Sequence, residues 1–432
     1  MKTNYPAKAF IAAGLGCLSF GILLGLTAGI QYVIPGFLKD SLAFFQTRPM
    51  HTLLVTGWIF LTAIGIIYHV LCENKIEKYL FLTWLHFGLF SLTGIMALGA
   101  YLLKQFGGRE YLEYPPVLSI PLLLSWLIFA FNFFKIIYHE KKKQPVYIWM
   151  WGTGILFFIL TFIEAHLWLF PWFRQNIIRE LTIQWKSYGA LTGSWNMLVY
   201  GIALWLMAKM KNDARYARSG IAFALYFLGL TNLMFGWGHH TYPVPAAPWI
   251  REIAYLVSMS ELLILGKIIF DFSKNSDENI RNENVMAFRM IKSADFWVFF
   301  NLVLALIISV PYFNQFTHGT HITVAHAMGT TIGINTFILF SALFYMKGKA
   351  TSRRDNFVRI SFYILNFSLA LFLFSFIMAG IEKSWWQFHH PEITFRQMQS
   401  SLWPWFATML VAGTGLVYGL GVLVAKIVGG KN

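Results

Sequence analysis

The sequence predicts an all-α integral membrane protein with about twelve transmembrane helices. Hydrophobic residues make up 57% and charged residues only 12% of the 432 residues, whereas soluble domains carry about 25% charged residues. The mean hydropathy is +0.56. Because a soluble chain of this length would leave much of that apolar surface in water, we expect a lipid bilayer to be its solvent.

Apolar windows of about 20 residues, long enough to cross a bilayer, account for most of the chain. We find no domain boundary, low-complexity tract or internal repeat, so residues 1–432 are expected to form a single membrane domain. The first window has no cleavage site of small residues and is interpreted as a retained span. The predicted spans are 9–34, 50–72, 78–104, 117–138, 146–171, 183–208, 218–238, 249–272, 293–312, 319–346, 357–381 and 400–426.

Lys and Arg gather on one side of this predicted bundle. Basic linkers near residues 140–143, 209–218, 274–292 and 347–359 all follow even-numbered spans. The positive-inside rule then places both termini in the cytoplasm. The net charge of +15 is explained by these loops, so nucleic acid is not an expected partner.

Two cysteines, Cys17 and Cys72, lie in or at the end of apolar windows and indicate neither a disulfide framework nor a zinc site. The sequence has no Cys-x-x-Cys-His, the motif that attaches c-type haem. No covalently bound haem is therefore expected in this chain.

Half of the twelve histidines fall in three short clusters at one predicted depth. The second span begins at its outer end with His51, the seventh ends there with a His-His pair, and the tenth carries His326 about two turns below its outer end. Intramembrane histidines are costly and usually functional, and imidazole binds iron, copper and haem. We therefore expect metal ligands in the set His51, His239, His240, His318, His321 and His326.

The tenth span offers two ligands to two different sites. His326 and Met328 are two residues apart, which is roughly 200° around a helix axis. One helix can therefore ligate two separate haems. Met328 by itself would be interpreted as packing, but opposite His51 it becomes a candidate axial thioether.

At these residues the chain resembles the haem-copper oxidase superfamily. Within it, the chain is most similar to the large subunits of cytochrome c-dependent bacterial nitric oxide reductases. The resemblance covers essentially all of the chain, and the fold it implies is that of oxidase subunit I. It is carried by four stretches, Arg48-Pro-Met-His51-Thr52, Gly108-Arg109-Glu110-Tyr111-Leu112-Glu113, Gly238-His239-His240 and Thr317 to His326.

The resemblance implies three metal-containing cofactors and their ligands. A low-spin haem b would take His51, and a high-spin haem b3 would take His326 as its proximal ligand. A non-haem iron, with copper as the alternative, would take His239 and His240. Glu261 in the eighth span matches a buried glutamate near the active site, and its alternative is a carboxyl paired with Lys267 or a nearby hydroxyl.

The stretch after the third span matches an acidic segment of the family that lies near a calcium ion bridging haem propionates. Carboxylate oxygens of Glu110 and Glu113 suit calcium, and the guanidinium of Arg109 suits propionates. An ordinary solvated loop is the alternative interpretation of these three residues.

Four positions depart from the family pattern. The sixth span has Tyr188 where the family has a third histidine for the non-haem metal, and Thr192 and Asn196 stand at two glutamate positions. Tyr188 is expected either to ligate as a phenolate or to donate a hydrogen bond. Met328 stands where the family has the second low-spin haem histidine, and a thioether raises the potential of a haem.

The function that the resemblance implies is reduction of nitric oxide to nitrous oxide in the inner membrane of a bacterium. The expected electron donor is a small redox subunit of cytochrome c or cupredoxin type at the outer face, near His51 and Arg109. Because the sixth span differs, three alternatives stay open: NO dismutation, reduction of dioxygen, and a haem-bearing electron-transfer or gas-binding subunit without turnover. A transporter would show broken helices around a central site, and nothing in the sequence favours that.

Overall fold

The computed structural model describes residues 5–72, 80–139, 143–241, 244–245, 247–348 and 356–429. Within these ranges the chain is almost entirely helical, and the one strand-like pairing is an isolated bridge between Arg109 and Leu112. Twelve helical segments of the described ranges are long and apolar enough to cross a membrane. The predicted all-α fold with twelve spans is therefore confirmed, and the chain is a multi-pass membrane protein.

The described helices cluster into two compact units. Met1–Gly14 and Ile59–Arg281 form the first unit, and Leu15–Trp58 and Asn282–Asn432 form the second. The sequence predicted a single membrane domain over residues 1–432, and this stays a prediction. Two long helices, α1 (Tyr5–Val33) and α2 (Phe44–Cys72), each contribute one part to either unit.

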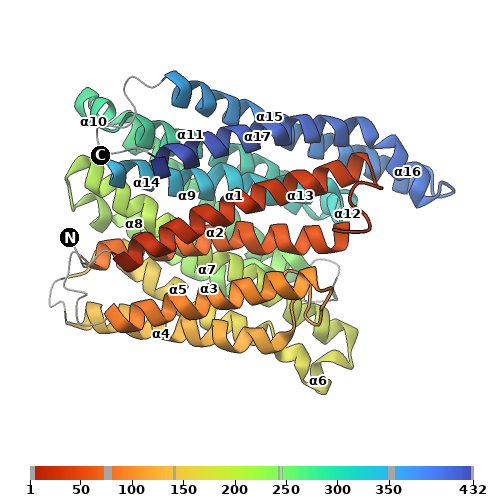
Figure 1. Ribbon diagram of the computed structural model, residues 1–432, viewed down its shortest axis with the longest axis horizontal. Helices are drawn as coiled ribbons and strands as arrows, with labels where there is room; N and C mark the ends of the chain where they lie inside the picture. Colours follow the sequence, from red (N-terminus) through yellow and green to blue (C-terminus); the bar gives the residue numbers. More distant parts are fainter. Residues whose placement is uncertain are drawn as a thin grey trace. The chain divides into compact units, whose positions relative to one another are not determined.

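The first unit holds spans three to eight (Figure 1). In it α3 packs on α4, α4 on α5, α5 on α7, and α8 on α9, so that neighbours in sequence are mostly neighbours in space. The elements in chain order are α3 (Leu80–Leu102), η3 (Pro116–Leu118), α4 (Ser119–Tyr138), α5 (Val146–Glu164), η4 (Leu167–Leu169), α6 (Pro171–Arg174), α7 (Ile177–Lys211), η5 (Tyr216–Arg218), α8 (Gly220–Phe235), η6 (Gly236–Thr241), α9 (Pro248–Lys274) and α10 (Glu278–Glu283), the last of which belongs to both units.

The second unit is built on α15 and α17, which pack along each other, and on the tenth span, which packs against α11 and α15. Its α15 has 34 residues and is therefore about 51 Å long, longer than the roughly 30 Å hydrocarbon core of a bilayer. The elements are α11 (Val285–Ser309), α12 (Pro311–Thr317), α13 (His321–Met328), η7 (Gly329–Thr336), α14 (Phe337–Lys347), α15 (Asn356–His389), α16 (Phe395–Ser401) and α17 (Trp403–Gly429).

The tenth span changes its helix type in the middle. After α13, residues Gly329–Thr336 form the π-helix η7, and α-helical geometry returns at Phe337. π-helical turns in α-helices are rare and frequently lie at functional sites. The π-helix begins directly after Met328. His326 and Met328, the two candidate haem ligands of this span, therefore lie in the last turn of α13.

The predicted span boundaries agree with the helices except at five ends. α2 begins six residues before the predicted span at 50, α7 six residues before 183 and α11 eight residues before 293, while α15 ends eight residues after 381. In the other direction, α5 ends seven residues before 171. Each extension carries charged or polar residues, such as Arg179, Arg289 and Lys383. Backbone hydrogen bonds continue past the apolar window because a helix end outside hydrocarbon accepts polar side chains.

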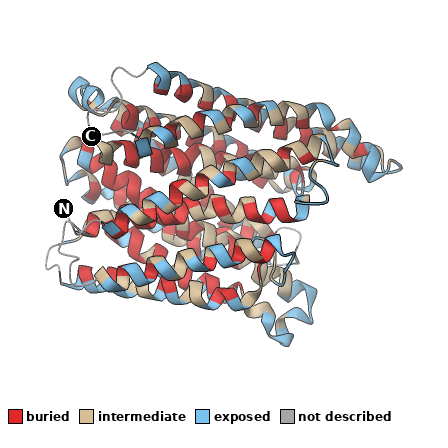
Figure 2. Cartoon of the chain, in the orientation of Figure 1, coloured by how far each residue is buried: buried red, intermediate tan, exposed pale blue. Residues whose placement is uncertain are grey.

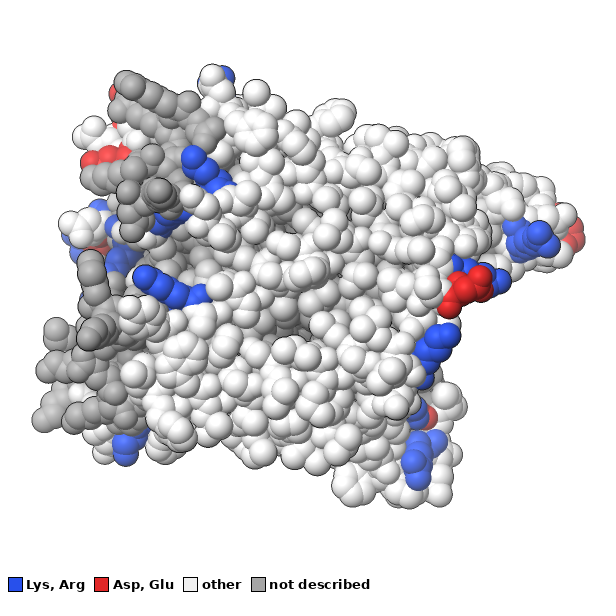
Figure 3. Space-filling model, viewed as in Figure 1, with Lys and Arg blue, Asp and Glu red and all other residues white. Residues whose placement is uncertain are grey.

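Burial and charge follow the pattern of membrane helices. Buried residues lie on the sides of the helices that face their neighbours within each unit (Figure 2). On the face drawn in Figure 3, the visible charged side chains lie toward the helix ends and the stretch between them carries almost none. Residues 140–142 and 349–355, which belong to two of the basic linkers, lie outside the described residues, and the cytoplasmic placement of both termini stays a prediction.

Candidate functional site

His239 and His240 lie next to each other on η6, which continues α8. Helices α7, α8 and α9 all pack against this short segment. The centroids of the two imidazole rings are 4.0 Å apart with 42° between the ring planes, and the ring of Trp185 lies nearly parallel to that of His240 at 6.3 Å. The tight helix therefore holds the two imidazoles close together, and their predicted role as metal ligands stays a prediction.

The buried carboxyl of Glu261 connects to this pair through two other side chains. Glu261 is 4% exposed and accepts a hydrogen bond from Nδ2 of Asn232. Ser258 donates to Oδ1 of Asn232 at 3.0 Å, and its oxygen lies 3.4 Å from Nδ1 of His239. The pairing with Lys267, one alternative from the sequence, is not what occurs, since Lys267 binds Asp271 at 2.9 Å.

Tyr188 lies on α7, where that helix comes closest to the histidine pair. A Cβ on the following residue, Gly189, would lie 3.0 Å from Cδ2 of His240. The ring of Tyr188 itself meets Tyr111 edge-on, with 5.7 Å between centroids. Its buried hydroxyl has no hydrogen-bond partner among the residues that the structure describes, so it is available to a ligand, and its role as metal ligand or proton donor stays a prediction.

The histidine pair does not form a complete metal site by itself. Within the described ranges, no group of three or more His, Cys, Asp or Glu side chains is placed to hold a metal ion. First-row metals normally take four or more ligands. Two imidazoles on one short helix fit an incomplete first-row metal site that further ligands, solvent or substrate would finish.

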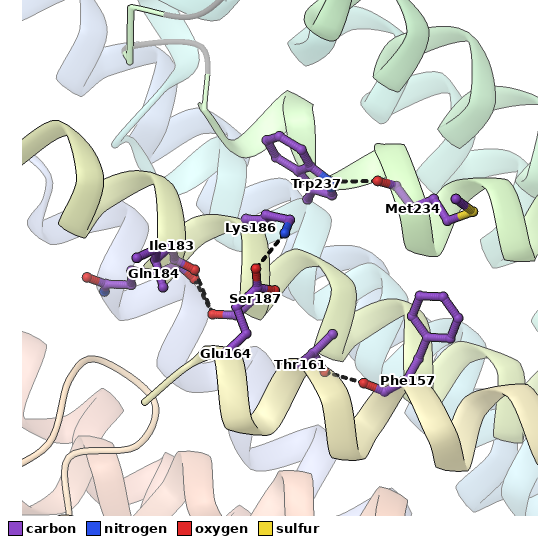
Figure 4. A network of polar contacts seen from close by, with 9 residues as sticks. All are labelled: Phe157, Thr161, Glu164, Ile183, Gln184, Lys186, Ser187, Met234 and Trp237. Atoms are coloured by element: carbon purple, nitrogen blue, oxygen red, sulfur yellow. Dashed lines mark hydrogen bonds and ion pairs between the residues drawn. The ribbon is translucent and has the colours of Figure 1, made fainter. Parts of the chain in front are cut away.

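An ion pair between α5 and α7 lies beside the η6 segment (Figure 4). Lys186 donates to Glu164 at 2.5 Å, and the indole of Trp237 donates to the carbonyl of Met234 at 2.7 Å. Lys186 is only two residues before Tyr188 on α7. The ion pair therefore anchors to α5 the end of α7 that carries the candidate phenol.

The loop after α3 is held by contacts that the sequence did not predict. Nε of Arg109 donates to Glu180 of α7 at 2.7 Å, and the Arg109 guanidinium lies over the ring of Trp168 at 4.1 Å. Glu110 and Glu113 lie on the same loop. The predicted roles of Arg109 toward propionates and of Glu110 and Glu113 toward calcium stay predictions.

Backbone geometry shapes this loop as well. A Cβ on Gly108 would lie 1.7 Å from the carbonyl oxygen of Leu112, so only glycine fits there. Tyr111 has a φ of +67°, which is rare for a residue with a side chain. Burial raises the pKa of Tyr114, at the end of the loop, to about 12, so this phenol stays neutral at physiological pH.

In the second unit, His51 is oriented as an iron ligand would be. Its Nδ1 lies 2.8 Å from the carbonyl oxygen of Gly21 on α1, and because a carbonyl only accepts, Nδ1 carries the proton. The lone pair is then on Nε2, which is the arrangement found in metal-binding histidines. Gly25 leaves space for the ring, since a Cβ there would lie 2.7 Å from its Cε1.

A hydrogen bond sets the register between α2 and the tenth span. Trp58 Nε1 donates to Oγ1 of Thr336 at 3.0 Å, and the two helices run in the same direction in the second unit (Figure 1). His51 is seven residues before Trp58, and Met328 is eight before Thr336. His51 therefore lies roughly 10 Å back from this contact along α2, and Met328 precedes the π-helix that Thr336 ends, so both candidate ligands lie on the same side of the contact.

His326 is half-buried, and the backbone of Asn301 lies close to its imidazole. Its Nδ1 is buried and makes no hydrogen bond of ordinary distance and angle among the described residues. The same holds for Nε2 of His86 and Nδ1 of His321, so this feature does not by itself distinguish a ligand, and the predicted role of His326 stays a prediction.

The other two histidines of this cluster have different surroundings. His321 begins α13, and its ring stacks parallel to Phe376 and meets Phe406 edge-on at 5.2 Å. Burial lowers the pKa of His318, before α13, which favours neutral imidazole. Two histidines outside these clusters, His86 and His166, hydrogen-bond to Tyr68 at 2.9 Å and to Ser119 at 2.6 Å.

Three residues of the site were not predicted from the sequence: Asn232, Ser258 and Glu180. Ser258 and Glu261 are three residues apart and so lie on one face of α9, which is a pattern that the sequence contains. Asn232 and Glu180 have no such neighbour, because their partners come from other helices. Only the packing of α7, α8 and α9 makes these contacts recognisable.

Comparison with known proteins places these residues in a family context. The family described as cytochrome c and quinol oxidase polypeptide I matches residues 5–415. The chain is 21% identical over 424 residues to a nitric oxide reductase subunit of Stutzerimonas stutzeri, covering 89% of this chain and 85% of that protein. It is 22% identical over 435 residues to a cytochrome c oxidase subunit 1 homolog of Agrobacterium tumefaciens (strain T37), covering 94% and 80%.

A solved structure has the same fold. The cryo-EM structure of a haem-copper terminal oxidase dimer matches with a TM-score of 0.74 and 15% sequence identity. The match covers 99% of this chain and 84% of the other. At this identity the similarity supports the fold alone, and it agrees with the subunit I-like architecture predicted from the sequence.

Proposed function

The chain belongs to the cytochrome c and quinol oxidase polypeptide I family of the haem-copper oxidase superfamily, and on that premise we propose that it is the catalytic membrane subunit of a nitric oxide reductase. Members of this family are membrane oxidoreductases that bind haem groups and a metal at a binuclear centre, and they work with other subunits and redox donors. Reduction of NO is the specific activity proposed for this chain.

The buried carboxyl beside the histidine pair carries the proposal. Glu261 is connected to His239 through Asn232 and Ser258, so the histidine pair has a buried carboxyl in its surroundings that is not itself placed as a third ligand. The similarity to the Stutzerimonas nitric oxide reductase supports iron as the metal that the pair would hold.

We assign the haem ligands as the sequence predicted them. His51 and Met328 would hold a low-spin haem b, and His326 would hold a high-spin haem b3. His239 and His240 would hold the non-haem iron. The tautomer of His51 and its position relative to Met328 support this assignment.

The proposed reaction consumes two NO molecules, two electrons and two protons and yields one N₂O and one water. The bound metals would supply the redox chemistry. The residues of this chain hold the ligands and exclude water, and they supply protonatable groups near the substrate. Tyr188 and Glu261 are the two groups proposed for that last role, because the phenol is buried without a partner among the described residues and the carboxyl is buried next to the pair.

The same proposal assigns roles to the loop after α3 and to the outer face of the protein. Glu110 and Glu113 would bind a calcium ion, and Arg109 would balance haem propionates while held by Glu180. The electrons would come from a companion redox subunit of cytochrome c or cupredoxin type on the periplasmic side of a bacterial inner membrane. Such a subunit is expected to copurify from native membranes, and full activity of the isolated chain with a quinol would contradict this.

Reduction of dioxygen is the second candidate. α7 carries Thr192 and Asn196 where the family pattern has glutamates, and the 22% sequence identity to a cytochrome c oxidase subunit 1 homolog is close to the 21% identity to the nitric oxide reductase subunit. Dismutation of NO and a non-catalytic haem protein complete the alternatives. Supplying purified protein with reductant and either NO or O₂, and measuring N₂O formation and O₂ consumption, separates the candidates.

The proposal predicts the cofactor content of the purified protein. Three ligand sets imply two non-covalent haems and one non-haem metal per chain, because no c-type attachment motif is present. Pyridine haemochrome analysis together with elemental analysis for iron and copper is expected to give two haems and one further iron. A preparation that saturates at one haem would contradict the assignment of His51, Met328 and His326 to two haems.

A further inference from the structure

A continuous row of polar side chains joins Glu261 to His239 inside the first unit. Asn232 on α8 donates its Nδ2 to Oε2 of Glu261 on α9. Ser258, one turn before Glu261, donates to Oδ1 of Asn232 at 3.0 Å, and its oxygen lies 3.4 Å from Nδ1 of His239. Asn232 and Ser258 have no role in the proposed reaction so far.

In this row, the carboxyl of Glu261 determines which side chain donates and which accepts in each hydrogen bond. Because Oε2 of Glu261 accepts, Asn232 turns its amino group toward Glu261 and its carbonyl toward Ser258. The hydroxyl of Ser258 donates its single hydrogen to that carbonyl, so its oxygen can only accept from His239. His239 therefore carries its proton on Nδ1, and its lone pair is on Nε2, the nitrogen that a metal would bind.

Two glycines keep the space that this row needs. A Cβ on Gly236 would lie 1.6 Å from Oδ1 of Asn232, and a Cβ on Gly229 would lie 3.1 Å from Oε1 of Glu261. Any side chain at Gly236 would displace the Asn232 amide. Glycine at position 236 therefore leaves the space that the Asn232 amide occupies in this row.

We propose that Ser258 and Asn232 are positioning residues that fix the Nδ1–H tautomer of His239 and couple this ligand to the negative charge of Glu261. The inference rests on the proposed function, because it needs His239 to bind a metal. An imidazole that donates from one nitrogen is a more basic ligand at the other, and loss of such a partner typically weakens metal binding 10–100-fold. The coupling would also make the electronic properties of the metal depend on Glu261.

Two variants of Ser258 separate the hydrogen bond from packing. Ser258→Ala removes the acceptor for His239 and is expected to weaken metal binding by about 10-fold or more, measured by chelator competition on the haem-loaded protein. Ser258→Thr keeps the hydroxyl and is expected to restore most of the affinity. Ser260→Ala is the matched control, since Ser260 is on the same helix with its hydroxyl bonded to the carbonyl of Leu256.

Two variants of Glu261 test the coupling to the charge. Glu261→Gln keeps an oxygen that accepts from Asn232, so the row and the tautomer of His239 persist without the negative charge. Glu261→Leu removes the acceptor as well. The metal affinity is expected to fall from wild type to the glutamine variant and further to the leucine variant, and the EPR signal of the metal is expected to change in both.

The outcomes are distinct. Metal affinity in Ser258→Ala equal to that of the wild type would overturn this inference and leave the proposed function in place. Equal losses in Ser258→Ala and Ser258→Thr would show that packing, and not the hydroxyl, matters, and would also overturn it. Wild-type protein with both haems and no non-haem metal would overturn the proposed function together with the inference.

Discussion

Replacing His239 with alanine is expected to remove the non-haem metal and reduce turnover of NO to background while both haems stay bound. The two imidazoles of η6 are the only histidine ligands assigned to that metal in the proposed site, and loss of one leaves too few donors for a first-row ion. Haem content from pyridine haemochrome spectra, iron content and N₂O formation would be measured on the same preparation. His390→Ala is the control, because His390 is outside the spans and pairs with Glu392.

A second variant at this site separates the two roles of the phenol. If Tyr188 is a ligand, Tyr188→Phe loses the metal as His239→Ala does. If it donates a proton, Tyr188→Phe keeps the metal and turns over slowly. Full NO turnover by His239→Ala would contradict the assignment of η6 to the metal and favour one of the alternative functions.

Replacing Met328 with alanine is expected to abolish the low-spin spectrum of one haem. The thioether would be lost as axial ligand, while His51 keeps its hydrogen bond to Gly21. The near-infrared charge-transfer band of a thioether-ligated ferric haem should be present in the oxidised wild type and absent in Met328→Ala. Met328→His should restore a low-spin haem with a lower potential, because histidine stabilises ferrous iron less than thioether does.

Met96→Ala is a matched control for this experiment. Met96 is 48% exposed on α3, so its loss should change neither the spectrum nor the potential. An unchanged low-spin spectrum in Met328→Ala would mean that another side chain is the second ligand. The assignment of His326 to the other haem would not be affected, since it depends on a different face of α13.

The spans were predictable because a bilayer imposes one simple constraint. A helix in hydrocarbon must satisfy its own backbone and present about 20 apolar residues, and that pattern is local in sequence. The helix ends were less predictable, as at Arg179 and Lys383, where hydrogen bonding continues into water. The π-helix after Met328 was not predicted, because the residues Gly329–Thr336 have no composition that distinguishes a π-turn from an α-turn.

The candidate site was predictable only in part. Histidines are rare in apolar windows, so His51, His239 and His326 could be recognised one at a time. Partners from other helices could not be recognised, because Asn232 meets Ser258 and Arg109 meets Glu180 only after packing. Arg109 shows the difference: its charge indicated an anionic partner, but the carboxylate that it binds is 71 residues away in sequence.

The π-helix in the tenth span constrains how this chain can change in length. A π-turn closes its hydrogen bond one residue later than an α-turn. Deleting one residue from Gly329–Thr336 can therefore be absorbed by a return to α-helical geometry, whereas a deletion in the α-helical turns on either side would rotate α14 relative to α13 by roughly 100°. Every residue from Phe337 to Phe344 is buried, so no face of α14 can turn toward lipid without cost. We therefore expect a single-residue deletion within the π-helix to be tolerated better than the same deletion in α13 or α14.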